Sequence, residues 1–252
     1  MITTELLTFR AKAARLFGRG PRVIAVFSYR YDAHLVPDLI ENLRPAIDGY
    51  AAYDDRAATS LFSDEPARRL ALIDAARGMA ARWVLFVDPD ERHEPALAEK
   101  MRTFTAAEGR VVWGFNFREL YKQDAYRTDG LWGRKKRFTL FPLLEGQVFD
   151  DAALHGPHHP KGYKRRLTGL NIYHLRMIAR QRRVARRDLY TALDPTAVHQ
   201  AVGYEYLADD EGMVLKKIPR KRLYRPPHRD DGGLWAAESG HSHAPEAVAR
   251  RQ

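Results

Sequence analysis

The amino-acid sequence predicts an α/β fold, because apolar runs and helical segments alternate along the first part of the chain. Three apolar runs, at 22–28, 46–53 and 83–87, have the composition of buried strands. Two segments with helical spacing of apolar residues, 37–44 and 63–80, separate these runs. A β-α-β-α-β order requires parallel strands joined by right-handed crossovers. A chain of 252 residues with 45% hydrophobic residues can bury the core of such a sheet.

Each element of this first half has its own local signal. Residues 1–20 have the pattern of a short basic amphipathic helix, which either docks on the domain or touches a membrane surface. Pro37 suits the first turn of the next helix. Ser63 offers a capping hydroxyl for the following helix, and the acids after it suit the positive end of the helix dipole. Within that helix we expect Leu70 and Ile73 to face inward.

The middle of the chain continues the pattern less regularly. A helix is predicted at 95–105, and a strand at 110–117. Residues 118–135 mix aromatic and charged side chains without a clear period and are predicted to form a loop. A strand at 136–144 contains Pro142, which indicates a sheet edge or a break. A last short strand is expected at 169–174.

The C-terminal part is predicted to be helical and then irregular. A strongly basic helix is expected at 177–193, and Asp194 and Pro195 start another that runs to about Leu207. The polar tail contains several glycines, and we expect partial disorder there. The predicted domain boundaries are an N-terminal leader at 1–20, an α/β domain at 21–175, a basic helical extension at 176–227 and a tail at 228–252.

Positive charge is concentrated in two segments. The net charge is +10, and residues 161–187 contain ten Lys or Arg and no Asp or Glu. Residues 216–225 contain six more Lys or Arg. Such runs favour anionic partners: nucleic acid, phosphorylated substrates or an anionic membrane face. The alternative is a solvated helical face in an arginine-rich chain.

The composition also bounds the compartment. The chain has no cysteine, which excludes disulfides and thiolate metal sites and fits a reducing compartment. No stretch approaches the roughly 20 apolar residues that span a bilayer, and the N-terminus has no secretory apolar segment. We therefore expect a cytoplasmic protein, with peripheral contact to an anionic membrane on its cytoplasmic face.

The third predicted strand ends in a cluster of acids. Pro89 cannot continue a central strand, so the chain leaves the sheet there. Asp88, Asp90 and Glu91 then lie together at the carboxyl edge of the sheet, where open α/β sheets bind their ligands. Three close carboxylates repel one another, and a divalent cation would relieve that repulsion. The alternative is a solvated acidic turn. The glycine-rich phosphate loops of dehydrogenases and of Walker-type proteins are absent.

These elements together resemble family 2 glycosyltransferases with the GT-A fold, in particular bacterial members with an Arg-Arg-x-x-Leu, Ala-Arg and Trp-Val-Leu-x-x-Asp-x-Asp-Glu block. The block stands here as 68–72, Ala76-Arg77 and 83–91. The loop at 54–59 resembles the family's Asp-Asp-x-Ser-x-Asp turn, although Ala57 and Ala58 depart from it. The resemblance covers roughly residues 20–175 and implies a GT-A domain followed by a C-terminal helical extension.

The resemblance implies a role for each acid and for the residues around it. A Mn²⁺ or Mg²⁺ ion would bridge the diphosphate of a sugar nucleotide as a Lewis acid. Asp90 would ligate it directly, Asp88 would touch the metal or the ribose, and Glu91 would orient either. A late histidine, His174, would complete the metal shell; its alternative is a buried imidazole with a backbone partner. The other nucleotide-sugar-binding residues implied are Ser28, Tyr29, Asp54, Asp55, Arg68 and Arg69.

Inverting glycosyl transfer also needs a carboxylate base across from the leaving group. Family members supply it from an acidic segment after the metal motif. Asp151 and then Asp150 are the favoured candidates here, with Glu145 as a third and an ordinary polar loop as the alternative. The histidines of 155–159 could bind zinc, but their prolines and glycine favour a substrate loop or plain surface. The aromatics of 121–137 either face an acceptor sugar or pack in the core.

The function we predict is metal-dependent, inverting transfer of a sugar from a nucleoside-diphosphate sugar to an acceptor hydroxyl in bacterial surface glycan or glycolipid synthesis. The acceptor is expected to be a glycan, a lipid-linked molecule or a small molecule. One alternative is a nucleic-acid-binding protein that uses the basic segments 161–187 and 216–225. It is disfavoured because the sequence has no nucleic-acid-binding motif. A second alternative is a nucleotidyltransferase, which also uses paired carboxylates and a divalent metal.

Overall fold

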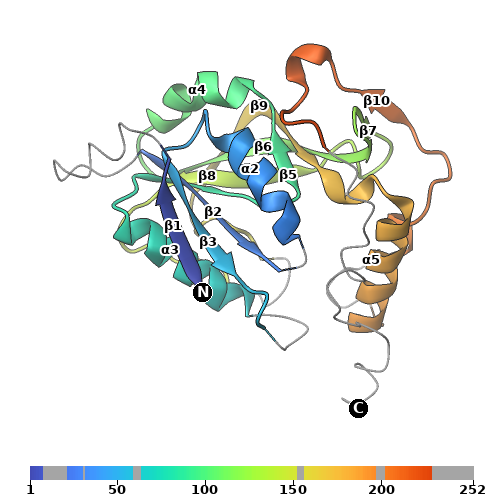
Figure 1. Cartoon of the computed structure of the whole chain (residues 1–252), viewed down its shortest axis with the longest axis horizontal. Coiled ribbons are helices and arrows are strands. Elements are labelled where there is room, and N and C mark those ends of the chain that lie inside the picture. The colour runs from blue at the N-terminus through green and yellow to red at the C-terminus, as the bar shows by residue number, and fades with distance from the viewer. Residues whose placement is uncertain (8–21, 31, 59–63, 152–155, 197–201, 229–252) are drawn as a thin grey trace.

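The predicted parallel strands form the centre of a mixed sheet (Figure 1). The computed structural model describes residues 1–7, 22–30, 32–58, 64–151, 156–196 and 202–228. Strand β2 (Val23–Tyr29) lies between β3 (Gly49–Asp54) and β4 (Trp83–Phe86) and is parallel to both. This arrangement confirms the predicted β-α-β-α-β order and puts the carboxyl ends of the three strands at one edge.

Two helices make the crossovers. Helix α2 (Val36–Leu43) follows a 3₁₀ turn, η1 (Ala33–Leu35), and carries a proline in its first turn as predicted. Helix α3 (Glu65–Gly78) begins at Asp64, whose carboxylate accepts a hydrogen bond from the Ala67 N–H at 2.9 Å. The predicted cap Ser63 lies outside the described residues. Ile73 is buried as predicted, whereas Leu70 is exposed, because the helix turns that side to solvent.

The remaining strands extend the sheet on the β4 side. Strand β8 (Lys136–Pro142) is antiparallel to β4, and β6 (Val111–Lys122) is antiparallel to β8. Strand β9 (Lys164–His174) runs parallel to β6 and pairs with the short β5 (Glu91–His93). The other elements are β1 (Ile2–Leu6), α4 (Ala96–Thr105), β7 (Ala125–Arg127), η2 (Leu175–Met177), α5 (Arg180–Leu193), η3 (Glu205–Leu207), β10 (Leu215–Lys217) and η4 (Arg220–Arg222).

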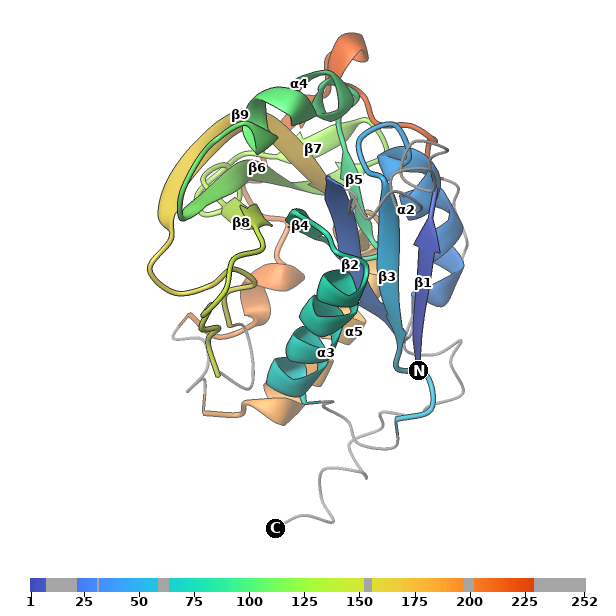
Figure 2. The same cartoon turned by 90° about the vertical axis from the view of Figure 1, so that its left-hand side faces the viewer.

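Alternate residues of the central strands build two separate apolar cores. Ala25 and Phe27 of β2 point to one face, where they pack with α2 and α4. Ile24 and Val26 point to the other face, where they pack with α3. Figure 2 shows α3 on the opposite side of the strands from α2. A strand buried on both faces needs a continuous apolar run, and this is the pattern that the sequence of β2 has.

Four sequence predictions about elements are wrong. Residues 2–6 form a strand antiparallel to β3 rather than a helix, because they complete the edge of the sheet. Residues 118–135 include the end of β6 and all of β7, so only part of the segment is loop. Strand β8 is not at a sheet edge, because it lies between β4 and β6, although the alternative of a break is confirmed, since Pro142 is its last residue, opposite Trp83. The helix expected up to Leu207 is absent over 202–204, where the described chain is a turn before η3.

The segment after β9 packs back onto the sheet. Tyr173 and Tyr224 share one apolar cluster, and Trp132 shares another with Tyr204. Arg222 forms two hydrogen bonds, of 2.6 and 2.7 Å, to the buried carboxylate of Glu94. The predicted disordered tail lies beyond the described residues. No helix in the described segments is long and apolar enough to cross a bilayer.

Candidate functional site: a cationic cleft at the carboxyl edge of the sheet

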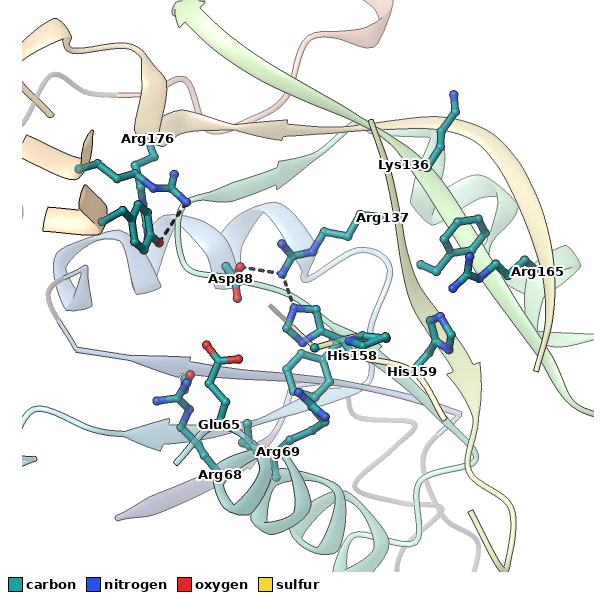
Figure 3. A pocket seen from close by; sticks show the side chains of 18 residues that line it. Glu65, Arg68, Arg69, Asp88, Lys136, Arg137, His158, His159, Arg165 and Arg176 are labelled. Carbon is teal, nitrogen blue, oxygen red and sulfur yellow. Dashed lines mark hydrogen bonds and ion pairs between the residues drawn. The ribbon is translucent and has the colours of Figure 1, made fainter. Parts of the chain in front are cut away.

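A cleft of about 670 Å³ opens where β2 and β4 end. Ser28, next to last in β2, and Asp88, two residues beyond β4, lie in its wall. The first turn of α3, the start of β8 and the segment 156–159 form the other sides (Figure 3). The cleft therefore occupies the edge at which parallel α/β sheets bind their ligands.

The lining of the cleft is strongly cationic. Its only carboxylates among the described residues are Glu65 and Asp88. Electrostatic attraction in a concave site with this balance favours an anion, and arginine forks suit phosphate oxygens. The seven basic side chains of the lining are Arg68, Arg69, Lys136, Arg137, Arg165, Arg176 and Arg186.

The basic run 161–187 thus contributes to the site rather than forming only a solvated face. Arg165 comes from β9, Arg176 from η2 and Arg186 from α5, and all three line the cleft. Arg183, in the same helix, is buried and pairs with Asp210. Part of the positive charge of this run therefore lines the cleft, and part forms internal ion pairs.

Asp88 and Glu91 are joined through Arg137. The Arg137 guanidinium lies 2.6 Å from Asp88 Oδ2 and 3.0 Å from Glu91 Oε1, and Glu91 also accepts the Asp88 N–H at 3.1 Å. Burial would raise the pKa of Asp88, but Arg137, His158 and Arg176 together outweigh burial and lower that pKa. Burial raises the pKa of Glu91 to about 8 despite Arg137. The cleft therefore presents Asp88 as an anion, while Glu91 holds the turn from behind.

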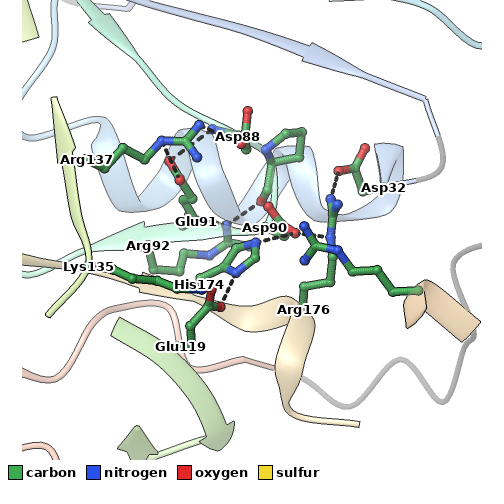
Figure 4. A network of polar contacts seen from close by, with 12 residues as sticks. Asp32, Asp88, Asp90, Glu91, Arg92, Glu119, Lys135, Arg137, His174 and Arg176 are labelled. Carbon is green, nitrogen blue, oxygen red and sulfur yellow. Dashed lines mark hydrogen bonds and ion pairs between the residues drawn. The ribbon is translucent and has the colours of Figure 1, made fainter. Parts of the chain in front are cut away.

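Asp90 lies in a buried chain of alternating charges behind the cleft (Figure 4). Its Oδ2 is 3.1 Å from His174 Nε2 and 2.5 Å from Arg176 Nε. On its other side His174 contacts Glu119 through Nδ1, and Lys135 lies 3.0 Å from Glu119. Figure 4 shows these side chains reaching toward one another from separate strands and turns. The chain therefore ties the acidic turn to the ends of β6 and β9.

His174 and Asp32, two groups of this network of charges, have displaced pKa values. Burial would lower the pKa of His174, but Glu119 and Asp90 outweigh it and raise that pKa to about 9. The ring is therefore cationic at neutral pH and donates to both carboxylates. Burial raises the pKa of Asp32 to about 6, although Arg176, 3.3 Å away, opposes the rise.

The predicted metal ligands differ in how they fit a divalent cation. The Asp88 side chain is 37% exposed and lines the cleft. Asp90 and His174 are buried against one another, and a doubly protonated imidazole has no lone pair for a metal. No group of three His, Asp or Glu side chains in the described segments would hold a metal by itself. Mg²⁺ commonly takes one or two carboxylates together with substrate phosphates, and Asp88 suits that mode.

The predicted nucleotide-binding residues lie in two places. Arg68 and Arg69 line the cleft with Ser28. Asp55 is buried and lies 3.1 Å from Arg68 Nη1, so it orients a cleft cation. Asp54 ends β3 and pairs with Arg56 at 2.6 Å, outside the lining of the cleft. The Arg56 guanidinium lies 5.5 Å from the ring centre of Tyr29, which places Tyr29 beside this pair.

The two predicted base residues lie next to the cleft but not in its lining. The carbonyl of Asp150 accepts a 2.6 Å hydrogen bond from Arg69, and its carboxylate is 3.5 Å from Lys161. Asp151 is exposed. The chain returns to the cleft at 156–159, where His158 stacks on Phe86 with ring centres 4.8 Å apart. Residues 156–159 therefore form part of the wall of the cleft rather than plain surface, and His155 lies outside the described residues.

The aromatics of 121–137 belong to the core rather than to an acceptor surface. Tyr121, Tyr126 and Trp132 are all buried, and Lys135 lies 4.2 Å over the Trp132 ring. Cation–π contacts of this kind hold the β6–β8 connection in place.

Sequence reasoning missed several residues that line the cleft, among them Arg137, Arg176, Arg186 and Glu65. The only sequence signal for Arg176 and Arg186 is their place in a basic run next to a predicted strand end. Arg137 has none, because the β4–β8 pairing alone brings it to Asp88. Comparison of the chain with protein-family models and with curated proteins finds no match to either.

Proposed function

We propose that the protein is a glycosyltransferase that binds a nucleoside-diphosphate sugar in the cationic cleft and transfers the sugar to an acceptor hydroxyl with inversion. The observation that carries this proposal is the meeting of Asp88 with seven Lys and Arg side chains at the carboxyl edge of β2 and β4. A diphosphate is the anion that such a set suits. The GT-A arrangement of residues 21–175, with 176–227 as an extension, is part of the same proposal.

The chain's own residues account for binding of the donor. The guanidinium group of Arg137 is fixed by Glu91 and that of Arg176 by Asp90, both buried behind the cleft, so the two arginines can meet a diphosphate without reorganising. Arg186 has a buried Nε without a hydrogen-bond partner among the described residues, and it lines the same cleft. Asp88 would hold Mn²⁺ or Mg²⁺ together with the donor phosphates. That ion supplies Lewis-acid stabilisation of the leaving diphosphate. Asp90 and His174 remain predicted metal ligands. Their contacts with each other, with Arg176 and with Glu119 also fit a structural role, in which they support the acidic turn.

In the transfer step the acceptor oxygen attacks the anomeric carbon from the face opposite the diphosphate. The bond from the anomeric carbon to the diphosphate oxygen breaks, and its electron pair leaves with the nucleoside diphosphate. The acceptor's proton passes to a carboxylate. Asp151, then Asp150, is proposed as that base, since the segment begins beside Arg69 at the rim of the cleft.

The binding part of the proposal is tested by thermal shift with UDP-, GDP- and dTDP-sugars, each with and without Mn²⁺. One of them should raise the melting temperature in a metal-dependent way, and Asp88→Asn should remove the metal dependence. Asp124→Asn is the matched control, because Asp124 lies in the turn between β6 and β7 and its nearest cation, Lys217, is 3.6 Å away. Stabilisation by none of the nucleotides would rule the proposal out.

The transfer part is tested by donor hydrolysis, which needs no acceptor. Asp151→Asn should lower turnover at least about 100-fold while the Kd of the donor changes less than about 2-fold. Glu65→Gln is the comparison variant, because Glu65 is the other carboxylate of the cleft. Full turnover in Asp151→Asn together with loss in Glu65→Gln would move the role of base to Glu65.

A nucleotidyltransferase remains the second candidate, because the same cations suit a triphosphate. The products separate the two: a nucleotidyltransferase releases pyrophosphate, whereas a glycosyltransferase releases a nucleoside diphosphate. We also propose a cytoplasmic location, which the lack of cysteine supports. The acceptor would be a glycan, a lipid-linked molecule or a small molecule of surface glycan synthesis.

A further inference from the structure

Helix α3 turns one continuous face toward the cleft, and Glu65 is the first residue on that face. Arg68, Arg69 and Leu72 follow at the i+3, i+4 and i+7 positions, and all four side chains line the cleft. In Figure 3 the Glu65 carboxylate points from the first turn of α3 toward Asp88. Glu65 therefore faces the space in which a ligand would lie, from the wall opposite the acidic turn.

The Glu65 carboxylate has no partner in the part of the chain that the structure describes. It forms no hydrogen bond there, and no basic nitrogen lies within 4.0 Å of it. A glutamate with arginines at i+3 and i+4 would ordinarily pair with one of them on the helix surface. Here Arg68 lies 3.1 Å from Asp55, and Arg69 donates to the Asp150 carbonyl at 2.6 Å. The fold thus directs both arginines elsewhere and leaves Glu65 as an open acceptor.

The charge of Glu65 is incompletely compensated by its surroundings. Burial raises the pKa of Glu65 above its ordinary value, and the charge of Asp88 acts in the same direction. Arg68, Arg69 and Arg137 lower that pKa but do not cancel the rise. A hydrogen bond donated by a ligand would stabilise the charged carboxylate. Such a bond is worth more here than at a carboxylate that is already paired.

The lining offers different groups to the two parts of a sugar nucleotide. The N–H groups of arginine and lysine suit phosphate oxygens, which accept hydrogen bonds. Sugar hydroxyls also donate, and an ionised carboxylate is an acceptor for them. The lining has two carboxylates among the described residues, and Asp88 already contacts Arg137 at 2.6 Å. Glu65 is therefore the carboxylate that is available to a hydroxyl.

We propose that Glu65 accepts a hydrogen bond from a hydroxyl of the transferred sugar and so favours the sugar nucleotide over the nucleoside diphosphate. The inference rests on the proposed function and adds a residue that determines its specificity. The place of Glu65 across from Asp88 suits this role, because the sugar is attached to the diphosphate that the Asp88 side would hold. After transfer the hydroxyl is gone and the released diphosphate carries an additional negative charge, which Glu65 repels.

The test is calorimetric titration, with Mn²⁺ present, of three matched pairs: UDP-glucose and UDP, GDP-mannose and GDP, and dTDP-glucose and dTDP. For the pair that binds, Glu65→Ala should weaken the sugar nucleotide about 10-fold, as for loss of a hydrogen bond to a charged group. It should not weaken the nucleoside diphosphate, because removal of a negative charge from the cleft favours an anion. Glu65→Gln keeps an acceptor oxygen and should weaken the sugar nucleotide about 3-fold.

The control is Glu99→Ala, which removes the same charge from the same kind of helix position. Glu99 lies in the first turn of α4, is exposed and does not line the cleft. Its loss should change the Kd of both members of the pair less than 2-fold. The Kd of the nucleoside diphosphate also reports whether each variant keeps a folded cleft.

The two members of a pair separate this role from the others that a cleft carboxylate could have. Equal weakening of both in Glu65→Ala would mean a structural or metal-binding role and would overturn the inference. Sugar-nucleotide binding that is unchanged or tighter would overturn it as well, because Glu65 would then act through charge repulsion alone or as a base. Absence of binding by all six ligands to the wild-type protein would instead count against the proposed function, and the inference would fall with it.

Discussion

Asp88 and Asp90 are two residues apart in one acidic turn, yet their surroundings differ completely. Asp88 faces the cleft and meets Arg137, whereas Asp90 is 2% exposed and lies between His174 and Arg176. The same turn therefore places one carboxylate in the cleft and the other in a buried network of charges. A carboxylate that a strand end delivers to the sheet edge is not by that fact a ligand-binding group, because its neighbours decide its role.

The largest effect that would sharpen this comparison is on stability. Asp90→Asn removes the buried charge between His174 and Arg176, which then keep only Glu119 and Asp32 as carboxylate partners, and we expect it to lower the free energy of unfolding by about 3–5 kcal/mol. Urea unfolding at pH 7, followed by circular dichroism, measures the change. A loss below about 1 kcal/mol would mean that the buried charge chain does not support the fold.

The second effect is a pH dependence of the free energy of unfolding, which comes from His174, the buried partner of Asp90. The pKa of His174 is raised to about 9, so its contribution is fully present below its ordinary value near 6.5 and is lost as the pH rises through 9. A pKa shift of this size corresponds to a loss of about 3 kcal/mol in the free energy of unfolding. His174→Gln should flatten the stability profile between pH 6.5 and 9, measured as the difference from wild type. Parallel profiles for the two proteins would contradict a cationic His174.

The smallest effect on stability is expected at Asp88, whose side chain faces the cleft. Asp88→Asn should change the free energy of unfolding by less than about 1 kcal/mol, since its carboxylate is partly solvated and Arg137 keeps Glu91 as a partner. The same urea measurement as for Asp90→Asn gives the comparison directly. Equal losses in the two variants would erase the distinction between a ligand-facing and a structural aspartate.

The first half of the fold could be predicted because its signals are local. Strand β2 is a continuous apolar run, and Pro37 and the acids of the first turn of α3 mark helix starts. The second half could be predicted only in part: strands were expected at 110–117 and 169–174, but residues 164–167 of β9 are exposed and form a strand only by pairing with β6. Lys164, Arg165 and Arg166 are all exposed and have no alternating apolar pattern.

The residues of the candidate site also divide into those that the sequence could place and those that it could not. Asp88 and Arg68 could be placed near each other from the β-α-β order, which brings strand ends to one edge. Arg137 and Arg176 could not, because they reach the turn from β8 and from η2, whose positions depend on antiparallel pairings that the sequence does not indicate. The burial of Asp90 follows from the same remote contacts, so the acids alone could not reveal which of them is open.

The cation-rich cleft has a practical consequence for anyone who handles the protein. The lining of the cleft has seven basic side chains and only two carboxylates among the described residues, so phosphate and sulfate ions should compete with nucleotides there and raise the melting temperature by themselves. A buffer chosen for solubility would then hide a ligand. Zwitterionic buffers with chloride as the only small anion leave the cleft open to the molecules being compared.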